Sequence, residues 1–358
     1  MNKEVFFVIG SLGGKGWGGA HRVICILANY LAEKGYPVTI IVWRDSPVDY
    51  PLNQAINLIW LHCNVKKMIE PCIKTRRILK QHPGAYLYAF MSRMATYARI
   101  YTTGLSIKVI GSERTDPRTE PHNAIFRLIR DHVFGFMYKT VYQTPDALAY
   151  FPKRAQKNGC VIPNPITPNL PKRFEGIRRK EFVTFCRIDK QKNLPMMIDS
   201  FVQVHSKYPE YKLRIYGTGL IETEIKDYIK KKQADKYIIM EGFASKVHES
   251  ILDCAGFLSS SDYEGLSNSM LEAMAIGLPC VCTDCPIGGA HMMIQDGVNG
   301  LLVPVGDSNA MAAAIIRLIE NVDLETRLSI EAEKVKQFLD ENIICKKWES
   351  LLYEENEI

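Results

Sequence analysis

The sequence predicts an α/β protein made of two doubly wound, Rossmann-like domains. Three observations lead to this prediction. The chain has 358 residues, enough for about two domains of ordinary size. Both halves alternate short β-branched or aromatic runs with helical patterns, as expected for βαβ units and parallel sheets. Residues 158–171 between the halves are rich in proline, which continues neither a helix nor a central strand.

The first half contains six predicted strands, each a short run rich in β-branched or aromatic residues. They are residues 5–9, 38–42, 56–61, 85–90, 108–110 and 140–143. A helix is expected over residues 22–34, because apolar residues repeat there at helical spacing and Gly35 follows as a stop signal.

Six further strands are predicted in the second half. They are residues 182–185, 213–216, 237–240, 255–258, 279–282 and 300–303. Twelve strands in one sheet are unusual, so we expect two sheets. Ligands of open α/β sheets bind beyond the carboxyl ends of the strands, so both sheets are expected to face a central cleft. The predicted domains are residues 1–168, residues 169–340 and a C-terminal helix, 341–358, packing back toward the first domain.

Composition indicates an ordinary globular protein, with 47% hydrophobic and 23% charged residues. No apolar run approaches the roughly 18–20 residues that cross a bilayer. The apolar stretch before Gly10 is short, so it is expected to be a first strand and not a signal peptide. Ten cysteines without an export signal are interpreted as reduced thiols, which predicts a cytoplasmic protein.

The charge is divided unequally between the halves. Residues 1–168 have a net charge of +12 and residues 169–358 a net charge of −6, which gives +6 for the chain. A basic first half predicts contact with a nucleic acid, an anionic membrane or a phosphorylated ligand, although uneven surface charge is the simpler alternative. The basic amphipathic segments 66–81 and 123–139 are expected either to pack on the sheet or to dock on an anionic membrane.

A glycine-rich loop at residues 10–19 follows the first predicted strand. It is not a P-loop, because Lys15 is followed by Gly16 instead of Ser or Thr. Gly14, Gly16 and Gly19 formally match the dinucleotide fingerprint, but so glycine-rich a loop matches many patterns by chance. The loop is interpreted as a phosphate contact at a helix N-terminus or as a flexible connection.

Two charged clusters follow predicted strands directly. The first spans residues 111–117 and contains Arg114 and Asp116, and the second contains Arg187 and Lys192. Arg187 and Lys192 suit a diphosphate, because a leaving group with that much negative charge departs only when it is neutralised. Solvated turns are the alternative for both clusters.

Two carboxylates flank a predicted helix N-terminus. Glu264 lies in a loop, Ser267 is a natural N-cap, and Glu272 lies about two turns further along the helix, which stops at Gly277. The free N–H groups of the helix suit a phosphate, and a carboxylate suits a pair of sugar hydroxyls. An acidic pair that merely stabilises the helix dipole is the alternative.

A metal site is not expected. Cys280, Cys282 and Cys285 with His291 suggest zinc by composition. Cys280 and Cys282, however, point to the same side of a strand, which favours a place in the core.

These motifs together resemble those of the retaining nucleotide-sugar glycosyltransferases of family 4, which have the two-domain GT-B fold. The resemblance extends from about Phe6 to Gly306, and Glu264 and Glu272, separated by seven residues, are its most specific mark. The other motifs are Gly18-Gly19-Ala-His-Arg22, Ser112-Glu-Arg-Thr-Asp-Pro117, Val161-Ile-Pro-Asn-Pro165, Arg187-Ile-Asp-Lys-Gln-Lys-Asn193, Gly217-Thr-Gly219, Glu241-Gly-Phe243 and Asp296-Gly-Val-Asn-Gly300.

The resemblance implies an N-terminal acceptor domain and a C-terminal nucleotide-sugar donor domain. Arg187 and Lys192 would hold the donor diphosphate, Glu264 would contact the transferred sugar, and Glu272 would bind the ribose hydroxyls. The loop at Phe243 would receive the nucleobase, usually uracil. Further donor-binding residues would be Gly18, Gly19, Gly217, Gly265, Leu266 and Ser267. The family needs neither a cofactor nor a metal for catalysis, and the sequence has no Asp-x-Asp.

Two positions depart from the family pattern. Cys186 stands where many members have glycine, and Arg114 stands where several members have a histidine near the reacting sugar. The box around Arg114 also looks like the Ser-Glu-Arg-Asn-Asp-Pro version of bacterial surface-polysaccharide transferases, with Thr115 in place of Asn. Arg114 could therefore support the diphosphate, and Asp116 could orient the acceptor.

The sequence is therefore interpreted as a retaining, metal-independent glycosyltransferase. It would move hexose or N-acetylhexosamine from a UDP-sugar to a saccharide or polyprenyl-diphosphate-linked acceptor, with no nucleic-acid partner. The expected place is the inner face of the cytoplasmic membrane, with the basic domain on the anionic surface, during capsule, exopolysaccharide or lipopolysaccharide O-antigen synthesis.

Three alternatives stay open at this point. One is another GT-B enzyme such as a UDP-sugar epimerase. The second is an NADP-dependent dehydrogenase that uses the glycine fingerprint, with Arg44 near the 2′-phosphate. The third is a sugar-nucleotide-binding protein without catalysis.

Overall fold

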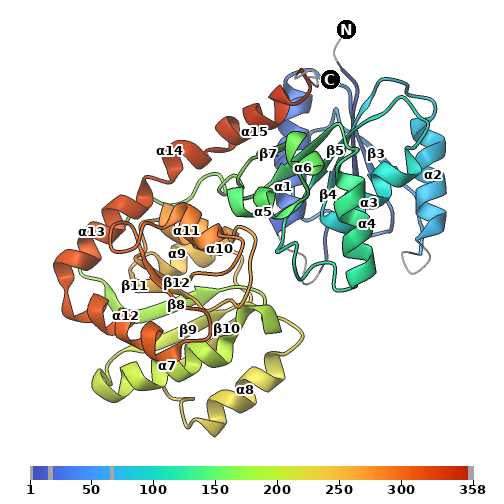
Figure 1. Ribbon diagram of the computed structural model, residues 1–358. Coiled ribbons are helices and arrows are strands. Elements are labelled where there is room, and N and C mark those ends of the chain that lie inside the picture. Colours follow the sequence, from blue (N-terminus) through green and yellow to red (C-terminus); the bar gives the residue numbers. More distant parts are fainter. Residues whose placement is uncertain (1–2, 15–18, 65–67, 354–358) are drawn as a thin grey trace. The chain divides into compact units, whose positions relative to one another are not determined.

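A computed structural model of the chain describes residues 3–14, 19–64 and 68–353. The chain divides into two compact units, one of residues 1–165 with 341–358 and the other of residues 166–340. Each unit is a parallel sheet with helices packed against it (Figure 1). The predicted boundary at residue 168 lies close to this division.

The described residues of the first unit form a seven-stranded parallel sheet in the order β3-β2-β1-β4-β5-β6-β7. The six strands predicted from sequence are all present. Residues 158–171 were predicted to be a linker throughout, and this is wrong at its start, because β7 pairs there with β6. The strands are β1 (Val5–Ile9), β2 (Val38–Val42), β3 (Asn57–Trp60), β4 (Tyr86–Phe90), β5 (Lys108–Ser112), β6 (Lys139–Tyr142) and β7 (Gly159–Val161).

Helices connect these strands and cover the sheet. The first begins at Gly19 and ends at Glu33, close to the predicted range of 22–34. The helices of this unit are α1 (Gly19–Glu33), α2 (Ile69–Leu79), α3 (Ser92–Tyr101), α4 (Ala124–Phe134), α5 (Pro145–Tyr150), α6 (Lys153–Lys157) and α15 (Glu341–Ser350).

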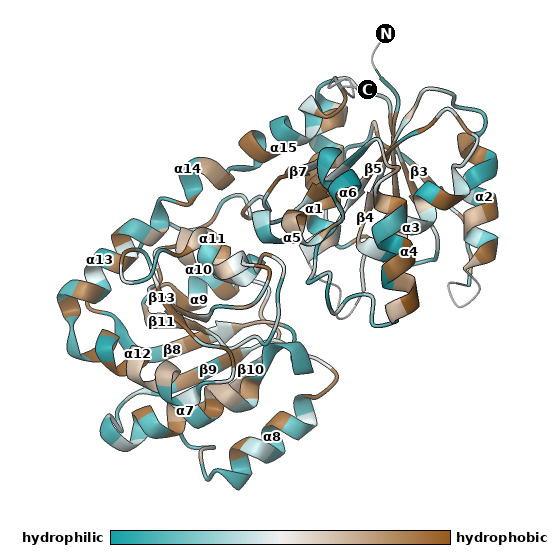
Figure 2. Cartoon of the chain, viewed as in Figure 1, coloured by the Kyte–Doolittle hydropathy of each residue, from teal (hydrophilic) through white to brown (hydrophobic). Residues whose placement is uncertain are grey.

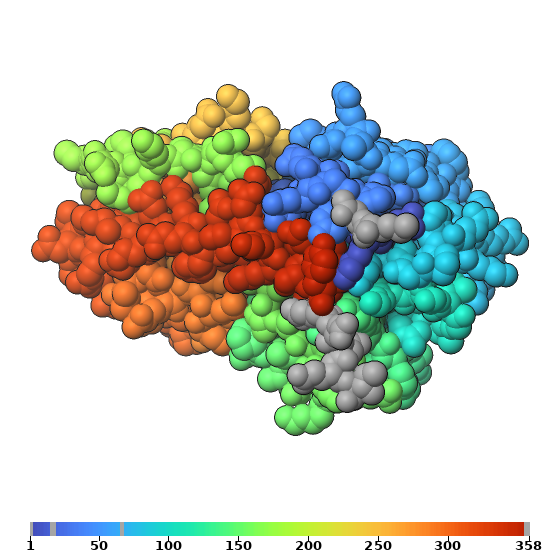
Figure 3. Space-filling model, turned by 90° about the horizontal axis from the view of Figure 1, so that it is seen from above, coloured from blue at the N-terminus to red at the C-terminus, as the bar shows by residue number. Residues whose placement is uncertain are grey.

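The C-terminal helix α15 belongs to the first unit. The fully buried Trp348 lies with its ring 5.1 Å from Phe90 and 5.9 Å from Tyr88, both on β4. The Tyr88 hydroxyl also donates a hydrogen bond of 2.9 Å to the Trp348 carbonyl. Figure 3 shows α15, in red, beside the blue residues of α1, which it contacts. The last helix is therefore held to the first sheet by aromatic packing.

In the second unit the described residues form a six-stranded parallel sheet in the order β10-β9-β8-β11-β12-β13. Its order repeats that of the first six strands of the other unit. In both sheets the order reverses beside the first strand, which is where doubly wound folds place their ligand sites. The strands are β8 (Arg179–Phe185), β9 (Lys212–Tyr216), β10 (Ile238–Gly242), β11 (Cys254–Ser259), β12 (Cys280–Thr283) and β13 (Leu301–Val303).

The central strands of both sheets are buried on both faces, which explains why they read in the sequence as continuous apolar runs. The elements that cover the second sheet are the 3-10 helix η1 (Lys190–Lys192) and the helices α7 (Leu194–Lys207), α8 (Glu222–Lys231), α9 (Val247–Ile251), α10 (Asn268–Ala275), α11 (Gly289–Met293), α12 (Ser308–Glu320), α13 (Val322–Glu333) and α14 (Lys336–Leu339).

A buried arginine fastens the segment that enters the second sheet. Arg178, directly before β8, donates to the carbonyls of Cys254 at 3.0 Å and Gly277 at 2.8 Å. Its guanidinium also pairs with Glu325 of α13 at 2.6 Å. Burial lowers the pKa of Arg178, and the negative charge of Glu325 opposes that shift. Arg178 therefore ties β8 to the loops and helices at the amino end of the sheet.

Candidate functional site

Two loops that are distant in the sequence meet at the carboxyl edge of the second sheet. The loop after β8 carries Arg187 and Lys192, and the loop after β11 carries Glu264. The Asp262 amide donates to the Gln191 carbonyl at 2.9 Å. The carboxyl ends of parallel strands lie at the same edge of a sheet, and for this reason both loops could be predicted from the sequence to belong to one site.

Lys192 and Glu264 form an ion pair in this site. Glu264 also accepts hydrogen bonds from the Ser261 hydroxyl at 3.0 Å and the Gln191 amide at 3.1 Å. Burial disfavours the charged form of Lys192, but the negative charge of Glu264 outweighs it and the pKa of Lys192 is raised. The cation predicted to bind phosphate therefore stays charged, and it contacts the carboxylate predicted to bind the sugar.

Arg187 is placed differently from Lys192. Its side chain is half exposed and lies 3.2 Å from the Asp189 carboxylate. It also donates to the Gln191 side-chain oxygen over 3.5 Å. Gln191 therefore bridges Arg187 and Glu264, and sequence reasoning did not single it out, because a glutamine in a charged turn gives no signal of its own.

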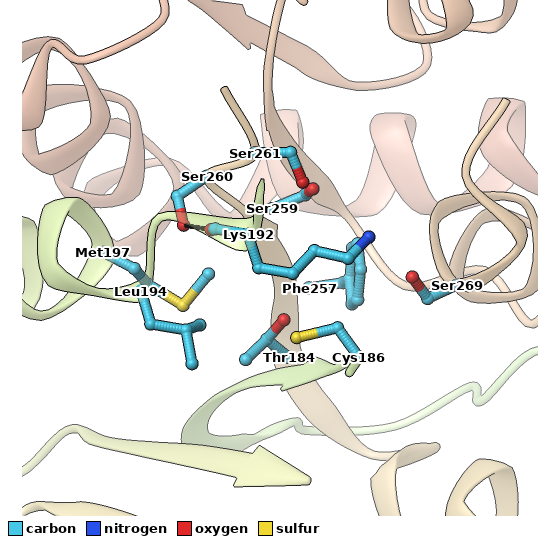
Figure 4. A pocket seen from close by; sticks show the side chains of 10 residues that line it. All are labelled: Thr184, Cys186, Lys192, Leu194, Met197, Phe257, Ser259, Ser260, Ser261 and Ser269. Carbon is cyan, nitrogen blue, oxygen red and sulfur yellow. Dashed lines mark hydrogen bonds between the residues drawn. The ribbon is translucent and has the colours of Figure 1, made fainter. Parts of the chain in front are cut away.

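A small pocket surrounds the Lys192 side chain. Figure 4 shows Lys192 reaching across it toward the hydroxyls of Ser261 and Ser269. Cys186, which stands where many family members have glycine, lines the pocket with its thiol, and burial raises the pKa of that thiol to about 11. The pocket thus surrounds one ammonium with hydroxyls, a thiol and three apolar side chains. Its residues are Thr184, Cys186, Lys192, Leu194, Met197, Phe257, Ser259, Ser260, Ser261 and Ser269.

The loop after β9 approaches the loop after β8 so closely that side chains are excluded. Gly217 has φ of 131°, and a Cβ there would lie 1.8 Å from the Cys186 carbonyl oxygen. A Cβ at Gly219 would lie 2.1 Å from the Ile188 carbonyl oxygen. Both glycines of the Gly-Thr-Gly motif are therefore required by backbone packing, whatever they contribute to a ligand.

Helix α10 has the predicted N-cap. Ser267 accepts a hydrogen bond from the Met270 amide at 3.4 Å, and Gly265 and Leu266 precede it in the loop. A Cβ at Gly289, on α11, would lie 1.8 Å from the Gly265 carbonyl oxygen. The helix N-terminus is thus held from one side by the backbone of α11.

Glu272 lies on α10 and is buried, with both carboxylate oxygens engaged. The Thr167 hydroxyl donates to one at 2.7 Å, and the His248 ring nitrogen lies 2.9 Å from the other. Thr167 lies in the chain segment that connects β7 to β8, and His248 lies on the short helix α9. Both are distant from Glu272 in the sequence, so only folding brings them to it.

Phe243, expected near the nucleobase, follows β10 and is 77% exposed.

In the first unit, Arg114 and Asp116 follow β5 and are both buried. The Arg114 guanidinium contacts the side-chain oxygen of Asn164 and lies 5.3 Å from the Phe90 ring. Burial lowers the pKa of Arg114 to about 9, with the charge of Arg22 adding to the effect and Glu113 opposing it. Asn164 belongs to the Pro-Asn-Pro motif, so the structure joins two of the predicted motifs.

Asp116 is engaged within its own turn. Its carboxylate accepts a hydrogen bond from the Arg118 amide at 2.9 Å and pairs with the Arg118 guanidinium at 3.2 Å. Glu113, in the same box, is fully buried and lies 3.6 Å from Arg130. Burial raises the pKa of Glu113, and the charge of Arg130 opposes the shift. Glu113 therefore serves the structure of this turn.

The glycine-rich loop is described only at its ends. Lys15, Gly16 and Gly18 lie outside the described residues, and Gly19 is the first residue of α1. The predicted phosphate contact of this loop stays a prediction.

The three cysteines whose spacing suggests zinc lie in the core. Cys280 and Cys282 are buried in β12, and the Cys285 thiol donates to the Ser261 carbonyl at 2.9 Å. Within the ranges 3–14, 19–64 and 68–353, no three His, Cys, Asp or Glu side chains gather to hold a metal ion. Across those ranges, too, we find no helix with the length and apolar character needed to span a membrane.

The two parallel-sheet units have the architecture of the GT-B fold, and comparison with solved structures agrees. The structure of Anabaena HepE in complex with UDP and glucose superimposes with a TM-score of 0.83 over 98% of this chain and 100% of that one, at 17% identity. The fold class predicted from the sequence is thereby confirmed.

Residues 179–321 match the family described as glycosyl transferases group 1, and this part of the chain is therefore a domain of that family. The amylovoran biosynthesis glycosyltransferase AmsD of Erwinia amylovora is 23% identical over 94% of this chain and 96% of its own.

A second relative is the N-acetylgalactosamine-N,N′-diacetylbacillosaminyl-diphospho-undecaprenol 4-alpha-N-acetylgalactosaminyltransferase of Campylobacter jejuni. It is 27% identical over 92% of this chain and 95% of its own. The chain spans about half the length of three other curated relatives that it matches, 46%, 52% and 45%.

Proposed function

We propose that the protein is a retaining, metal-independent glycosyltransferase that moves a hexose or N-acetylhexosamine from a UDP-sugar. The observation that carries this proposal is the Lys192–Glu264 ion pair beside the N-terminus of α10, at the carboxyl edge of the second sheet. It provides a cation for phosphate, a carboxylate for sugar hydroxyls and the positive end of a helix dipole for an anion within one site.

Lys192 and Arg187 would neutralise the diphosphate. As the bond between the sugar and the diphosphate breaks, negative charge grows on the leaving phosphate oxygen, and preorganised cations stabilise that charge. Lys192 is held by Glu264, and Arg187 is half exposed beside it in the same loop. Two side-chain cations in these positions can carry out the neutralisation for which other enzymes use a metal ion, so we propose that none is needed.

The remaining donor contacts follow from the same arrangement. Glu264 would accept hydrogen bonds from the transferred sugar, and Glu272 from the ribose hydroxyls. The exposed ring of Phe243 would lie against the uracil. The backbone N–H groups of Gly265, Leu266 and Ser267, together with Gly217, Gly18 and Gly19, would complete the donor site. No cofactor takes part.

Arg114 and Asp116 would act from the first unit. We propose that Arg114 supports the diphosphate and that Asp116 orients the acceptor. The position of both at the carboxyl end of β5 supports this, because ligands of doubly wound sheets bind at that edge.

The acceptor would be a saccharide, free or linked to a polyprenyl diphosphate, in the synthesis of a surface polysaccharide such as capsule or lipopolysaccharide. The diphospho-undecaprenol acceptor named for the Campylobacter relative and the amylovoran biosynthesis named for AmsD support this. A lipid-linked acceptor places the protein on the inner face of the cytoplasmic membrane, with the basic unit toward the anionic lipids.

The test is incubation of the protein with a panel of UDP-sugars, with and without EDTA, followed by analysis of the products. Slow release of UDP and free sugar from one donor, unchanged by EDTA, is the expected result. Formation of an isomeric UDP-sugar would identify an epimerase instead. Complete loss of turnover in EDTA would contradict the metal-independent mechanism.

A further inference from the structure

Helix α4 presents an apolar stripe to solvent. Ile125 is 69% exposed and Leu128 71% exposed, and Ile129 is also exposed. With His132, these residues recur at helical spacing and lie on one side of the helix. Figure 2 shows hydrophobic colour on the lower part of α4. Four neighbouring positions on one helix are thus turned toward solvent, three of them large apolar residues.

The opposite side of α4 holds the helix in the fold. Arg130 and Phe134 are fully buried there, and Phe134 stacks on Phe151 with ring centres 5.2 Å apart. Asn123 caps the first turn, accepting a hydrogen bond from the Phe126 amide. These contacts hold α4 in the fold from its buried side, whereas Ile125 and Leu128 stay largely exposed on the other side.

Arginines surround the stripe. It continues beyond the helix to the exposed Phe136, whose ring lies 3.6 Å from the Arg154 guanidinium. Arg99 donates to the Phe136 carbonyl at 2.6 Å. Near the start of the helix, the Arg93 guanidinium lies 5.7 Å from the Phe126 ring. Cations therefore lie at both ends of the apolar stripe.

No free carboxylate offsets these cations within α4. Asp131 is the only acidic residue between positions 121 and 145, and it pairs with the buried Arg130 at 2.7 Å. An apolar stripe between arginines matches the layers of an anionic bilayer, in which acyl chains lie beneath charged headgroups. A second protein surface would need a shape complementary to α4, whereas an anionic bilayer needs only an apolar stripe and flanking positive charges.

We propose that the exposed face of α4, formed by Ile125, Leu128, Ile129 and Phe136, docks the first unit on an anionic lipid surface. The proposal deepens the function proposed above and rests on it for the use of a lipid-linked acceptor. From the sequence, both basic segments, 66–81 and 123–139, are candidates for docking on a membrane. In α2, Ile69 and Ile73 are exposed, but Glu70 beside them pairs with Lys74, and residues 65–67 lie outside the described part of the chain.

The experiment is sedimentation of the full chain with vesicles of phosphatidylglycerol or of phosphatidylcholine. The wild type is expected to bind the anionic vesicles, less tightly as salt rises from about 0.1 to 1 M because the surface charges become screened. The double variant Ile125→Ser/Leu128→Ser is expected to bind at least about tenfold more weakly, since it removes two large apolar side chains.

A control carries two similar aliphatic-to-serine changes on the second unit, at Ile177 and Val322, which are 98% and 68% exposed. Ile177→Ser/Val322→Ser is expected to bind vesicles like the wild type. Equal vesicle binding by the α4 variant, or no binding by the wild type, would overturn the proposal. So would a wild-type dimer in vesicle-free solution that the α4 variant converts to monomer, since a second copy would then cover the stripe.

Stabilisation by UDP separates this proposal from the function proposed above. UDP is expected to raise the melting temperature of the wild type and of the α4 variant equally, because α4 carries none of the residues proposed for the donor site. Intact UDP stabilisation with unaltered vesicle binding would reject only the docking face. Loss of UDP stabilisation in the wild type would instead reject the proposed function.

Discussion

Lys192 is the residue on which the proposed chemistry depends most. Its ammonium is charged, partly buried and paired with Glu264. A cation in that position stabilises a leaving diphosphate more strongly as charge develops than in the ground state, and only such differential stabilisation accelerates the reaction. The chemistry of the site is therefore best tested one side chain at a time.

The first prediction concerns the diphosphate cations. Lys192→Ala and Arg187→Ala are each expected to lower kcat by about 10²–10³, with a smaller loss of UDP affinity, because one preorganised electrostatic contact is removed. Steady-state kinetics with the active UDP-sugar measures both effects. Lys190→Ala is the control, since Lys190 is an exposed lysine of the same loop. Near-native kcat in Lys192→Ala and Arg187→Ala would place the phosphates elsewhere.

The second prediction concerns Gln191 as a positioning residue. Gln191→Leu keeps the size of the side chain but removes its donation to Glu264 and to the Tyr263 carbonyl at 2.8 Å. The expected result is a fall in kcat of about tenfold with little change in KM for the donor, since a hydrogen bond to a charged group is lost. Gln203→Leu, the same change at an exposed position of α7, is the control. An unchanged kcat would show that Glu264 needs no orientation by Gln191.

The third prediction concerns Glu272. Glu272→Ala is expected to raise KM for the UDP-sugar at least about tenfold with kcat little changed, because ribose hydroxyls differ little between ground and transition state. Thr167→Val removes one hydrogen bond to Glu272 and is expected to produce a smaller rise. A loss confined to kcat in Glu272→Ala would assign this carboxylate to the reacting sugar.

At the scale of single elements, the segment that enters β8 determines how firmly the site's first strand is anchored. Arg178 donates to the carbonyl of Cys254, the first residue of β11, and to that of Gly277, and it pairs with the carboxylate of Glu325. The burial of Arg178 could not be predicted from the sequence, because an arginine beside a strand is ordinarily a surface residue. Its side chain is buried because α13 and the loop after α10 pack against it in the folded unit.

The fourth prediction therefore concerns stability. Arg178→Ala is expected to lower the free energy of unfolding by about 3–5 kcal/mol, since it leaves Glu325 and buried carbonyls without their partner. Lys180→Ala, which breaks an exposed pair with Glu210, is expected to cost about 0–1 kcal/mol. Denaturant unfolding of both variants measures the difference. Equal stability of the two variants would contradict the structural role of Arg178.

At the scale of the whole molecule, the two units divide the predicted tasks. The excess positive charge lies in residues 1–168, and most of the residues proposed for the donor site lie on the second unit. Under the proposed function, this division would separate recognition of an anionic surface from binding of a nucleotide. It also makes the two activities independently measurable.

The fifth prediction concerns nucleotide choice in the full chain. UDP is expected to stabilise the protein by about 2.7 kcal/mol at a concentration of 100 Kd, because a ligand bound by the native state adds RT ln(1 + [L]/Kd). EDTA is expected to leave this stabilisation intact. Thermal unfolding with UDP and with NADPH measures it. Stabilisation by NADPH and none by UDP would favour the dehydrogenase alternative.

The sequence by itself determined the fold class and the loops of the candidate site. Buried parallel strands are continuous apolar runs, so their positions are visible without coordinates. Arg187, Lys192 and Glu264 directly follow such runs and therefore belong to one sheet edge. β7 was not predicted, because a strand of three residues in a proline-rich stretch is too short to show a recognisable pattern.

Only the tertiary structure decided which side chains meet. Lys192 contacts Glu264, and Thr167 and His248 hold Glu272, across separations that local patterns do not reveal. The exposure of α4 was equally hidden, because an amphipathic sequence shows that a helix has two faces but not what covers each. Strand and helix patterns follow from local backbone geometry, whereas contacts between loops depend on how the whole sheet is assembled.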